Sequence, residues 1–133
     1  MSKEQNKKKK TILLVEDEPD NASIFTLALE DGGFEVHTFT NPLSALAEFS
    51  EGKKRYDLLI LDIKMPDMTG FELYEQIKKI DSKVKVCFLT AFGEGYTEEF
   101  EKRFPSPLLC VSFIRKPIRV QDFMKKVNEI MMI

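Results

Sequence analysis

Five side chains with acid, hydroxyl or amine groups follow apolar runs at the places where those runs end. Glu16 and Asp17 come directly after one run, and Asp62 closes another. Thr90 ends a third run, and Lys116 follows a fourth. Three carboxylates held close together repel one another and need a cation. Because the ligands on offer are oxygens, with no histidine or cysteine nearby in the sequence, a hard ion, Mg²⁺ or Mn²⁺, is favoured over zinc.

The same residues indicate a reaction. Mg²⁺ in proteins usually keeps several waters and binds one or two carboxylates together with a phosphate, so a site of this kind is incomplete without an anion. The Lys116 ammonium and the Thr90 hydroxyl are suitable partners for that anion. A carboxylate can itself act as the nucleophile and form an acyl phosphate. The residues therefore predict phosphoryl transfer onto Asp62, assisted by Mg²⁺.

Alternating strands and helices are expected to hold these residues in place. Short apolar or β-branched runs predict strands, and amphipathic stretches with capping or glycine signals predict the helices between them. The strands are expected at residues 11–15, 34–39, 57–62, 84–90 and 109–114, and the helices at 20–31, 42–52, 71–80 and 120–133, with a weak further pattern at 94–104. This alternation implies an α/β fold in which helices cover both faces of a parallel sheet. Ligand sites of such sheets lie beyond the carboxyl ends of the strands.

The spacing of apolar residues also predicts how the helices pack. The residues that share one face of the first, third and last helix are Ile24, Leu27 and Ala28, then Leu73, Ile77 and Ile80, then Phe123, Val127, Ile130 and Met131. We expect such faces to turn towards the sheet. Cys87 and Cys110 each lie in an apolar run and are too far apart for a CxxC pair, so we expect them in the core.

Length and charge limit the function further. The 133 residues are enough for one domain with a core of its own. The net charge is -2, but residues 1–10 carry five lysines against Glu4, a balance of +4, which leaves -6 on residues 11–133. This negative charge on residues 11–133 argues against nucleic acid as a ligand of the folded domain. We expect residues 1–10 to form a disordered, solvated tail and residues 11–133 to form the domain.

No segment of the sequence predicts contact with a membrane. The chain has no apolar run of the roughly 20 residues that a transmembrane helix needs. Its basic start also lacks the apolar stretch of a secretory signal. We therefore expect the protein to be cytoplasmic.

Four segments of the chain resemble the receiver domain of two-component response regulators. They are Ile12–Asp20, Leu58–Gly70, Leu89–Phe92 and Phe113–Ile118, in the order and spacing of that family. The resemblance covers almost all of residues 11–133. It implies a flavodoxin-like, doubly wound sheet with the strand order 2-1-3-4-5, in which the site lies where the strand order reverses.

The resemblance also implies roles at the metal site. Asp62 would be the phosphoacceptor and a ligand of the metal. Asp17 would bind Mg²⁺ directly and Glu16 would bind it through water, with the backbone carbonyl of Lys64 as a further ligand. Lys116 would contact the phosphoryl group.

Further implied roles concern the response to phosphorylation. Lys116 and Pro117 would be joined by a cis peptide bond, as is typical of the family. Thr90 would move to hydrogen-bond the phosphoryl group, and Phe113 would swing inward into the space that Thr90 vacates. A change of charge would in this way drive a packing change.

The implied function is that of a single-domain response regulator, which is a signalling phosphoacceptor and not an enzyme beyond catalysing its own phosphorylation and dephosphorylation. Its phosphoryl donor would be a histidine kinase or a histidine phosphotransfer protein. Its output would be a phosphorylation-dependent contact with an unknown protein, because the chain ends after the last helix, and a phosphorylation-dependent dimer is left open. A phosphorylation-independent interaction scaffold is the alternative. A haloacid-dehalogenase-type phosphatase is disfavoured because Lys64 stands where such enzymes have their second acid.

The sequence departs from the family pattern in three places. Glu16 replaces the aspartate that is often first in the acidic pair. Lys64 and Phe92 occupy the two variable positions that tune dephosphorylation in the family, which leaves the lifetime of the phosphorylated state open. Residues 93–109 contain two prolines and no Ala/Gly-rich turn, so the fourth helix is expected to be short or irregular.

Overall fold

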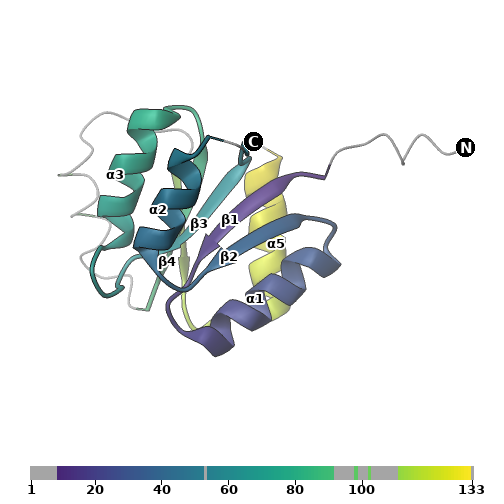
Figure 1. Ribbon diagram of the computed structural model, residues 1–133. Coiled ribbons are helices and arrows are strands. Elements are labelled where there is room, and N and C mark those ends of the chain that lie inside the picture. Colours follow the sequence, from purple (N-terminus) through teal and green to yellow (C-terminus); the bar gives the residue numbers. More distant parts are fainter. Residues whose placement is uncertain (1–8, 53, 92–97, 99–101, 103–110, 133) are drawn as a thin grey trace, which may run out of the picture.

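The computed structural model describes residues 9–52, 54–91, 98, 102 and 111–132 (Figure 1). Strands and helices alternate along this part of the chain. The strands are β1 (Thr11–Val15), β2 (Glu35–Phe39), β3 (Leu58–Asp62), β4 (Lys85–Thr90) and β5 (Val111–Arg115). The helices are α1 (Pro19–Asp31), α2 (Pro42–Ser50), α3 (Gly70–Ile80) and α5 (Val120–Met131).

The five strands form one parallel sheet in the order β2-β1-β3-β4-β5. The predicted flavodoxin-like strand order is therefore confirmed. Because all the strands run in the same direction, their carboxyl ends meet at one edge of the sheet. In register, Val15 pairs with Leu61, and Asp62 pairs with Leu89. The ends of β1, β3 and β4 thus lie side by side.

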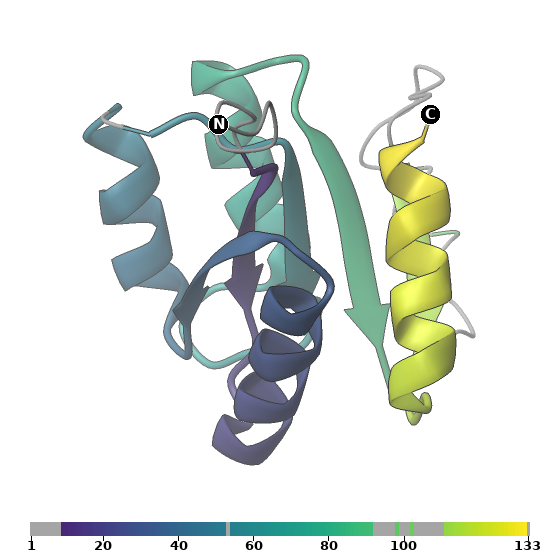
Figure 2. The same ribbon diagram turned by 90° about the vertical axis from the view of Figure 1, so that its right-hand side faces the viewer.

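The sheet separates two apolar cores. Helices α2 and α3 cover one face, and α1 and α5 cover the other (Figures 1 and 2). Alternate residues of β1 point to opposite faces, so that Leu13 packs in the α2/α3 core while Ile12 and Leu14 pack in the α1/α5 core. All three are fully buried. Burial on both faces explains why β1 and β3 are apolar at successive positions.

Short polar side chains fix the starts of two helices. The Asn41 side chain accepts hydrogen bonds from the amides of Leu43 and Ser44, and Pro42 opens α2. A capping box joins Thr69 and Glu72 at the start of α3. These caps satisfy amides that have no partner inside the helix.

The predicted faces of two helices need correction. Ile24 and Leu27 are exposed, at 48% and 67%. The buried residues of α1 are Ala22, Phe25 and Leu29. The ring of Phe25 stacks on Phe123 of α5 at 4.3 Å between centroids, so the larger aromatic side chain takes the core position. Ile80 in α3 is also exposed, at 52%, because it ends the helix beyond the edge of the core.

The other helix and cysteine predictions agree with the structure as far as it describes them. Phe123, Val127 and Ile130 are buried on α5, and Cys87 is buried on β4. The predicted tail at residues 1–8, Phe92, Cys110 and most of the predicted irregular segment at 93–109 lie outside the described residues. Among the described residues, no helix is long and apolar enough to span a membrane.

Candidate functional site at the carboxyl edge of the sheet

Three carboxylates meet at the carboxyl edge of the sheet. Glu16 and Asp17 follow β1, and Asp62 is the last residue of the neighbouring strand β3. One oxygen from each of the three lies within 4.8 Å of the others. Glu16 is fully buried, Asp62 is 5% exposed and Asp17 is half-buried. The cluster offers several oxygen ligands at the spacing that a single hard metal ion requires.

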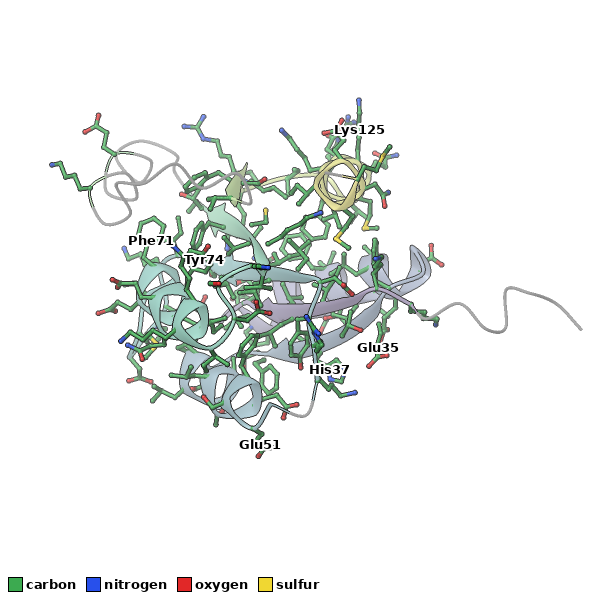
Figure 3. The ribbon with its side chains drawn as sticks, turned by 90° about the horizontal axis from the view of Figure 1, so that it is seen from above. Glu35, His37, Glu51, Phe71, Tyr74 and Lys125 are labelled. Carbon is green, nitrogen blue, oxygen red and sulfur yellow. The ribbon has the colours of Figure 1, made fainter. Side chains whose placement is uncertain are left out.

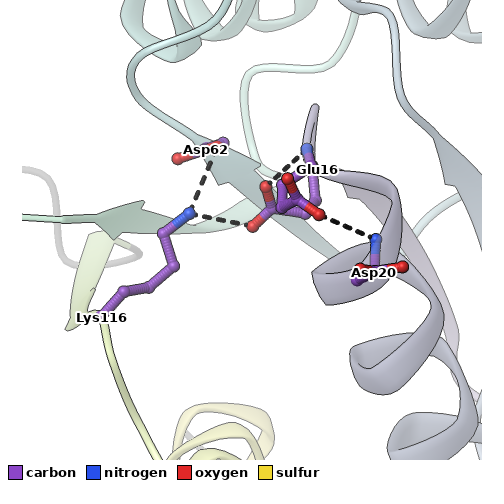
Figure 4. Close-up of polar contacts among 5 residues, drawn as sticks. Glu16, Asp20, Asp62 and Lys116 are labelled. Atoms are coloured by element: carbon purple, nitrogen blue, oxygen red, sulfur yellow. Dashed lines mark hydrogen bonds and ion pairs between the residues drawn. The ribbon is translucent and has the colours of Figure 1, made fainter.

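One ammonium group enters this cluster from the end of β5. The Nζ of Lys116 lies 3.0 Å from Oε1 of Glu16 and 3.3 Å from Oδ2 of Asp62 (Figure 4). The Lys116 backbone amide donates a hydrogen bond to the Thr90 carbonyl at 2.6 Å, which ties the residue to the end of β4. The peptide bond between Lys116 and Pro117 is cis, as the family resemblance predicted.

The direct pairing of Lys116 with Glu16 is a feature that the sequence did not reveal. The family resemblance gave Glu16 only a water-mediated role at the metal. Glutamate is one methylene longer than the aspartate that often stands at this position, and here its carboxylate reaches the ammonium. The replacement by glutamate was the available signal, but the two residues are 100 positions apart, so only the fold could show that they meet.

Hydrogen bonds hold the Glu16 carboxylate from its other side. Its Oε2 accepts from the Glu18 amide at 3.0 Å. The Glu18 side chain in turn accepts from the Asp20 amide at 3.1 Å and caps α1 (Figure 4). The loop from β1 to α1 is therefore tied to the buried acid, which leaves Asp17 between them at the surface of the cluster.

The negative charges outnumber the positive charge in this pocket. Burial raises the pKa of Asp62 to about 8, and the neighbouring Asp17 and Glu16 add to the shift, while Lys116 opposes it. Burial by itself would lower the pKa of the Lys116 ammonium, but Glu16 and Asp62 together raise it above its ordinary value. The ammonium therefore stays charged, while burial and the two neighbouring acids together keep the pKa of Asp62 high against the opposing effect of Lys116. A divalent cation would relieve that imbalance.

The loop after β3 packs tightly beneath Asp62. The Gly70 amide donates a hydrogen bond to the Ile63 carbonyl at 2.8 Å, and a Cβ on Gly70 would collide with the Asp62 carbonyl. Asp67 has a positive φ of 72°, a conformation that aspartate tolerates better than most residues. Gly70 therefore directly limits the position of the Asp62 backbone. Lys64, in the same loop, is exposed.

The two predicted switch residues lie on neighbouring strands beside the cluster. Thr90 ends β4 and is buried, at 3% exposed. Phe113 is half-buried on β5, with its ring 5.5 Å from that of Phe88. Phe88 in turn makes an edge contact with Phe71 of α3 at 4.9 Å. A chain of aromatic rings thus leads from the strand that carries Phe113 into the α2/α3 core.

Comparison with known proteins identifies similar sequences. The sequence model of the response regulator receiver domain matches residues 12–128. The response regulator receiver protein CpdR of Brucella abortus is 40% identical over 84 residues, which are 63% of this chain and 68% of CpdR. The regulatory protein VanRc of Enterococcus gallinarum is 33% identical over 117 residues, which are 88% of this chain but 48% of VanRc. The chain thus spans only about half of such longer regulators.

Solved structures show the same fold. A CheY-like response regulator receiver domain protein of Methanospirillum hungatei superposes with a TM-score of 0.79 at 27% identity, covering 93% of this chain and 94% of its own. The response regulator TrrA of Thermotoga maritima, crystallised in complex with Mg²⁺ and BeF, gives a TM-score of 0.75 at 29% identity, covering 91% and 98% of the two chains.

Proposed function

The chain belongs to the response regulator receiver domain family of two-component systems, whose members accept phosphoryl groups from histidine kinases, and we propose that Asp62 is its phosphoacceptor. The observation that carries the proposal is the position of the Asp62 carboxylate. It ends a fully buried strand, lies in a cluster of three acids, and has an ammonium 3.3 Å away. None of the other described acids combines these three features.

The donor set of the cluster fits Mg²⁺. Asp17 and Asp62 would bind the ion directly, Glu16 through water, and Lys64 through its backbone carbonyl. The excess negative charge of the pocket and its oxygen ligands favour this hard ion. When bound, Mg²⁺ supplies positive charge that offsets the acids and the phosphoryl oxygens. In the relative TrrA, Mg²⁺ is present together with BeF.

The reaction itself would be a displacement at phosphorus. One Asp62 carboxylate oxygen forms a bond to the phosphorus of a phosphohistidine, and the bond between phosphorus and the imidazole nitrogen breaks. The electron pair stays on that nitrogen, and the donor leaves as a neutral histidine because its other ring nitrogen carries a proton. The product is an acyl phosphate on Asp62. The protein contributes position and charge, which is the main source of catalysis in phosphoryl transfer.

Lys116 would stabilise the product. Its ammonium now contacts Glu16 and Asp62, and the raised pKa keeps it charged. On phosphorylation it would give up the contact with the Asp62 carboxylate for one with a phosphoryl oxygen. Its contact with Glu16 can persist, because an ammonium has three hydrogens to donate.

Thr90 and Phe113 would carry the signal away from the site. Thr90 would hydrogen-bond the phosphoryl group, and Phe113, which is half-buried beside Phe88, would then move inward. This change would alter the surface around β5 and create a phosphorylation-dependent contact for a partner protein. The switch residues are thus proposed to link the chemistry of Asp62 to the output.

The proposal can be tested by intact-mass spectrometry after incubation with acetyl phosphate and Mg²⁺. We expect one phosphoryl adduct that is lost in a chelating buffer and in an Asp62→Asn variant. An Asp57→Asn variant is the matched control, because Asp57 lies just before the same strand but at its opposite, exposed end. An adduct that survives Asp62→Asn would overturn the assignment, because another residue would then be the acceptor. No adduct in any variant, with Mg²⁺ shown to bind, would favour the phosphorylation-independent scaffold.

A further inference from the structure

A second charged feature lies at the opposite, amino edge of the sheet. Lys9 and Lys10 precede β1, and Lys54 and Arg55 precede β3, which is the next strand in the sheet. Three backbone-anchored hydrogen bonds hold these segments together. The Glu35 amide donates to the Lys10 carbonyl at 2.9 Å. Two more bonds, each 2.8 Å long, join Thr11 and Asp57.

The positive charges outnumber the negative charges here. The pocket formed at this edge is lined by Lys9, Lys10, Thr11, Glu35, Lys54, Arg55 and Asp57, which bring four cations and two carboxylates. Both carboxylates are already engaged. Glu35 accepts from Lys54 at 3.2 Å and contacts His37 at 2.7 Å (Figure 3), and Asp57 accepts from the Thr11 amide.

Three of the four cations are left for a ligand. Among the residues that the structure describes, no carboxylate forms an ion pair with Lys9, Lys10 or Arg55. The domain around them is acidic, with a balance of -6 over residues 11–133. A local excess of cations on an acidic body concentrates a positive potential at one place, and this attracts anions.

The shape of the pocket limits the kind of anion. Its volume is about 520 Å³, within the range of roughly 300–1,000 Å³ that is common for small-molecule sites. Its cations approach from the starts of β1 and β3, with Glu35 of β2 on the third side. A concave pocket of this size suits a compact ligand better than a flat membrane surface or a nucleic-acid duplex. Arginine and lysine are the side chains that proteins use to hold phosphate groups.

We propose that this amino-edge pocket binds a small soluble anion that carries at least two phosphate groups. One group would lie against Arg55, whose guanidinium can make two parallel hydrogen bonds to a phosphate. A second group would lie between Lys9 and Lys10. The proposal does not depend on the phosphoacceptor role of Asp62, which lies at the other end of β3.

Binding can be measured by calorimetric titration of the full chain with inorganic tripolyphosphate, in a buffer free of divalent ions. We expect saturable binding that weakens as salt is raised from 50 to 200 mM, because salt screens such contacts. A Lys54→Gln/Arg55→Gln double variant should bind at least tenfold more weakly. Both side chains are exposed, so the fold should be unaffected.

A matched control distinguishes binding in this pocket from binding that depends only on the net charge of the protein. Lys125→Gln/Lys126→Gln removes the same charge from α5, where Figure 3 shows Lys125 far from Glu35. This control should change the affinity less than twofold. Equal weakening in both double variants would overturn the proposal, because the binding would then reflect net charge only.

Two further measurements test where the anion binds and whether it is a small soluble molecule or part of a macromolecular surface. Amide shifts in the NMR spectrum should move at Thr11 and Arg55 and stay in place at Asp17 and Asp62. Shifts confined to the Lys116 site would overturn the proposal. So would a chain that ignores tripolyphosphate but binds vesicles of anionic lipid or a nucleic-acid duplex, which would assign the pocket to a macromolecular surface.

Discussion

At the carboxyl edge of the sheet three acids share one ammonium inside a buried pocket, whereas at the amino edge four cations share two acids in contact with solvent. Each edge contains a lysine and an acid at nearly the same separation. Lys116 lies 3.3 Å from Asp62, and Lys54 lies 3.2 Å from Glu35. The pairs differ in exposure. The first two side chains are 16% and 7% exposed, and the second two are 42% and 46% exposed.

The two acids respond in opposite directions. The pKa of Asp62 is raised to about 8, and burial is the main cause. The pKa of Glu35 is lowered, chiefly by its hydrogen bonds with His37 and Lys54. A nearby lysine therefore does not decide the state of an acid by itself. Desolvation and the number of neighbouring acids decide the protonation state of the acid. The carboxyl edge, with its buried acids Glu16 and Asp62 (the buried edge), is therefore suited to binding a metal and a phosphoryl group.

The largest expected effect comes from removing the single cation of the buried edge. Lys116→Met would leave Glu16 and Asp62 without their ammonium. Breaking a buried ion pair from one side costs about 3–5 kcal/mol, and because Lys116 is partly exposed we expect a loss of about 2–3 kcal/mol in the free energy of unfolding at pH 8. Urea denaturation in a chelating buffer measures this, and added Mg²⁺ should reduce the loss.

The amino edge of the sheet, where Lys54 and Glu35 are exposed (the exposed edge), supplies the control for this prediction. Lys54→Met removes a lysine at a similar distance from an acid, but both groups are solvated, and exposed pairs contribute little. Its urea midpoint should stay close to that of the unchanged protein. Losses of equal size at the two edges would mean that burial is not what distinguishes them.

A smaller effect of opposite sign is expected from removing an acid at the buried edge. Asp62→Asn should raise the free energy of unfolding by about 1–2 kcal/mol at pH 9 without Mg²⁺, because it removes one of several crowded charges from a buried site. Together with the loss in Lys116→Met, this gain would show that the pocket carries too much negative charge when it lacks a metal.

The pH dependence of that gain follows from the raised pKa. Between its ordinary value of 3.8 and about 8, Asp62 holds a proton in the folded chain and has lost it in the unfolded chain. Stability therefore falls as pH rises through this window. Asp62→Asn should lack this part of the slope in urea titrations from pH 5 to pH 9. A slope that Asp62→Asn leaves unchanged would contradict the assignment, and Asp57→Asn, at the exposed end of β3, serves as the control.

Much of the buried edge could be predicted from the sequence. Strands buried on both faces are apolar at successive residues, so the acid that ends each run is easy to find, and parallel strands bring those acids to one edge. The strand order came from family resemblance. The face of α1 was predicted wrongly, because apolar residues occur on both sides of that helix and only packing against Phe123 selects Phe25 over Ile24.

The exposed edge could not be predicted in this way. Its cations come from segments that are far apart in sequence, and they meet only because β1 pairs with both β2 and β3 in a particular register. A run of lysines is usually solvated, so neither segment indicates a pocket by itself. The Lys116–Glu16 contact has the same origin, because it depends on β1, β3, β4 and β5 lying in order across the sheet.

The smallest expected effect is at Glu35, and its sign tests the comparison most directly. Because the folded pKa lies below the ordinary value of 4.5, Glu35 adds stability above that value, and the contribution disappears as pH falls through the folded pKa. The melting temperature should therefore exceed that of Glu35→Gln slightly at pH 6, and the difference should shrink as pH is lowered below 4.5. The difference at pH 6 should shrink in 1 M salt, where the screening length is only about 3 Å. Asp62 and Glu35 each lie beside a lysine, so slopes of stability against pH with opposite signs would show that burial separates the two edges, and slopes of the same sign would refute that explanation.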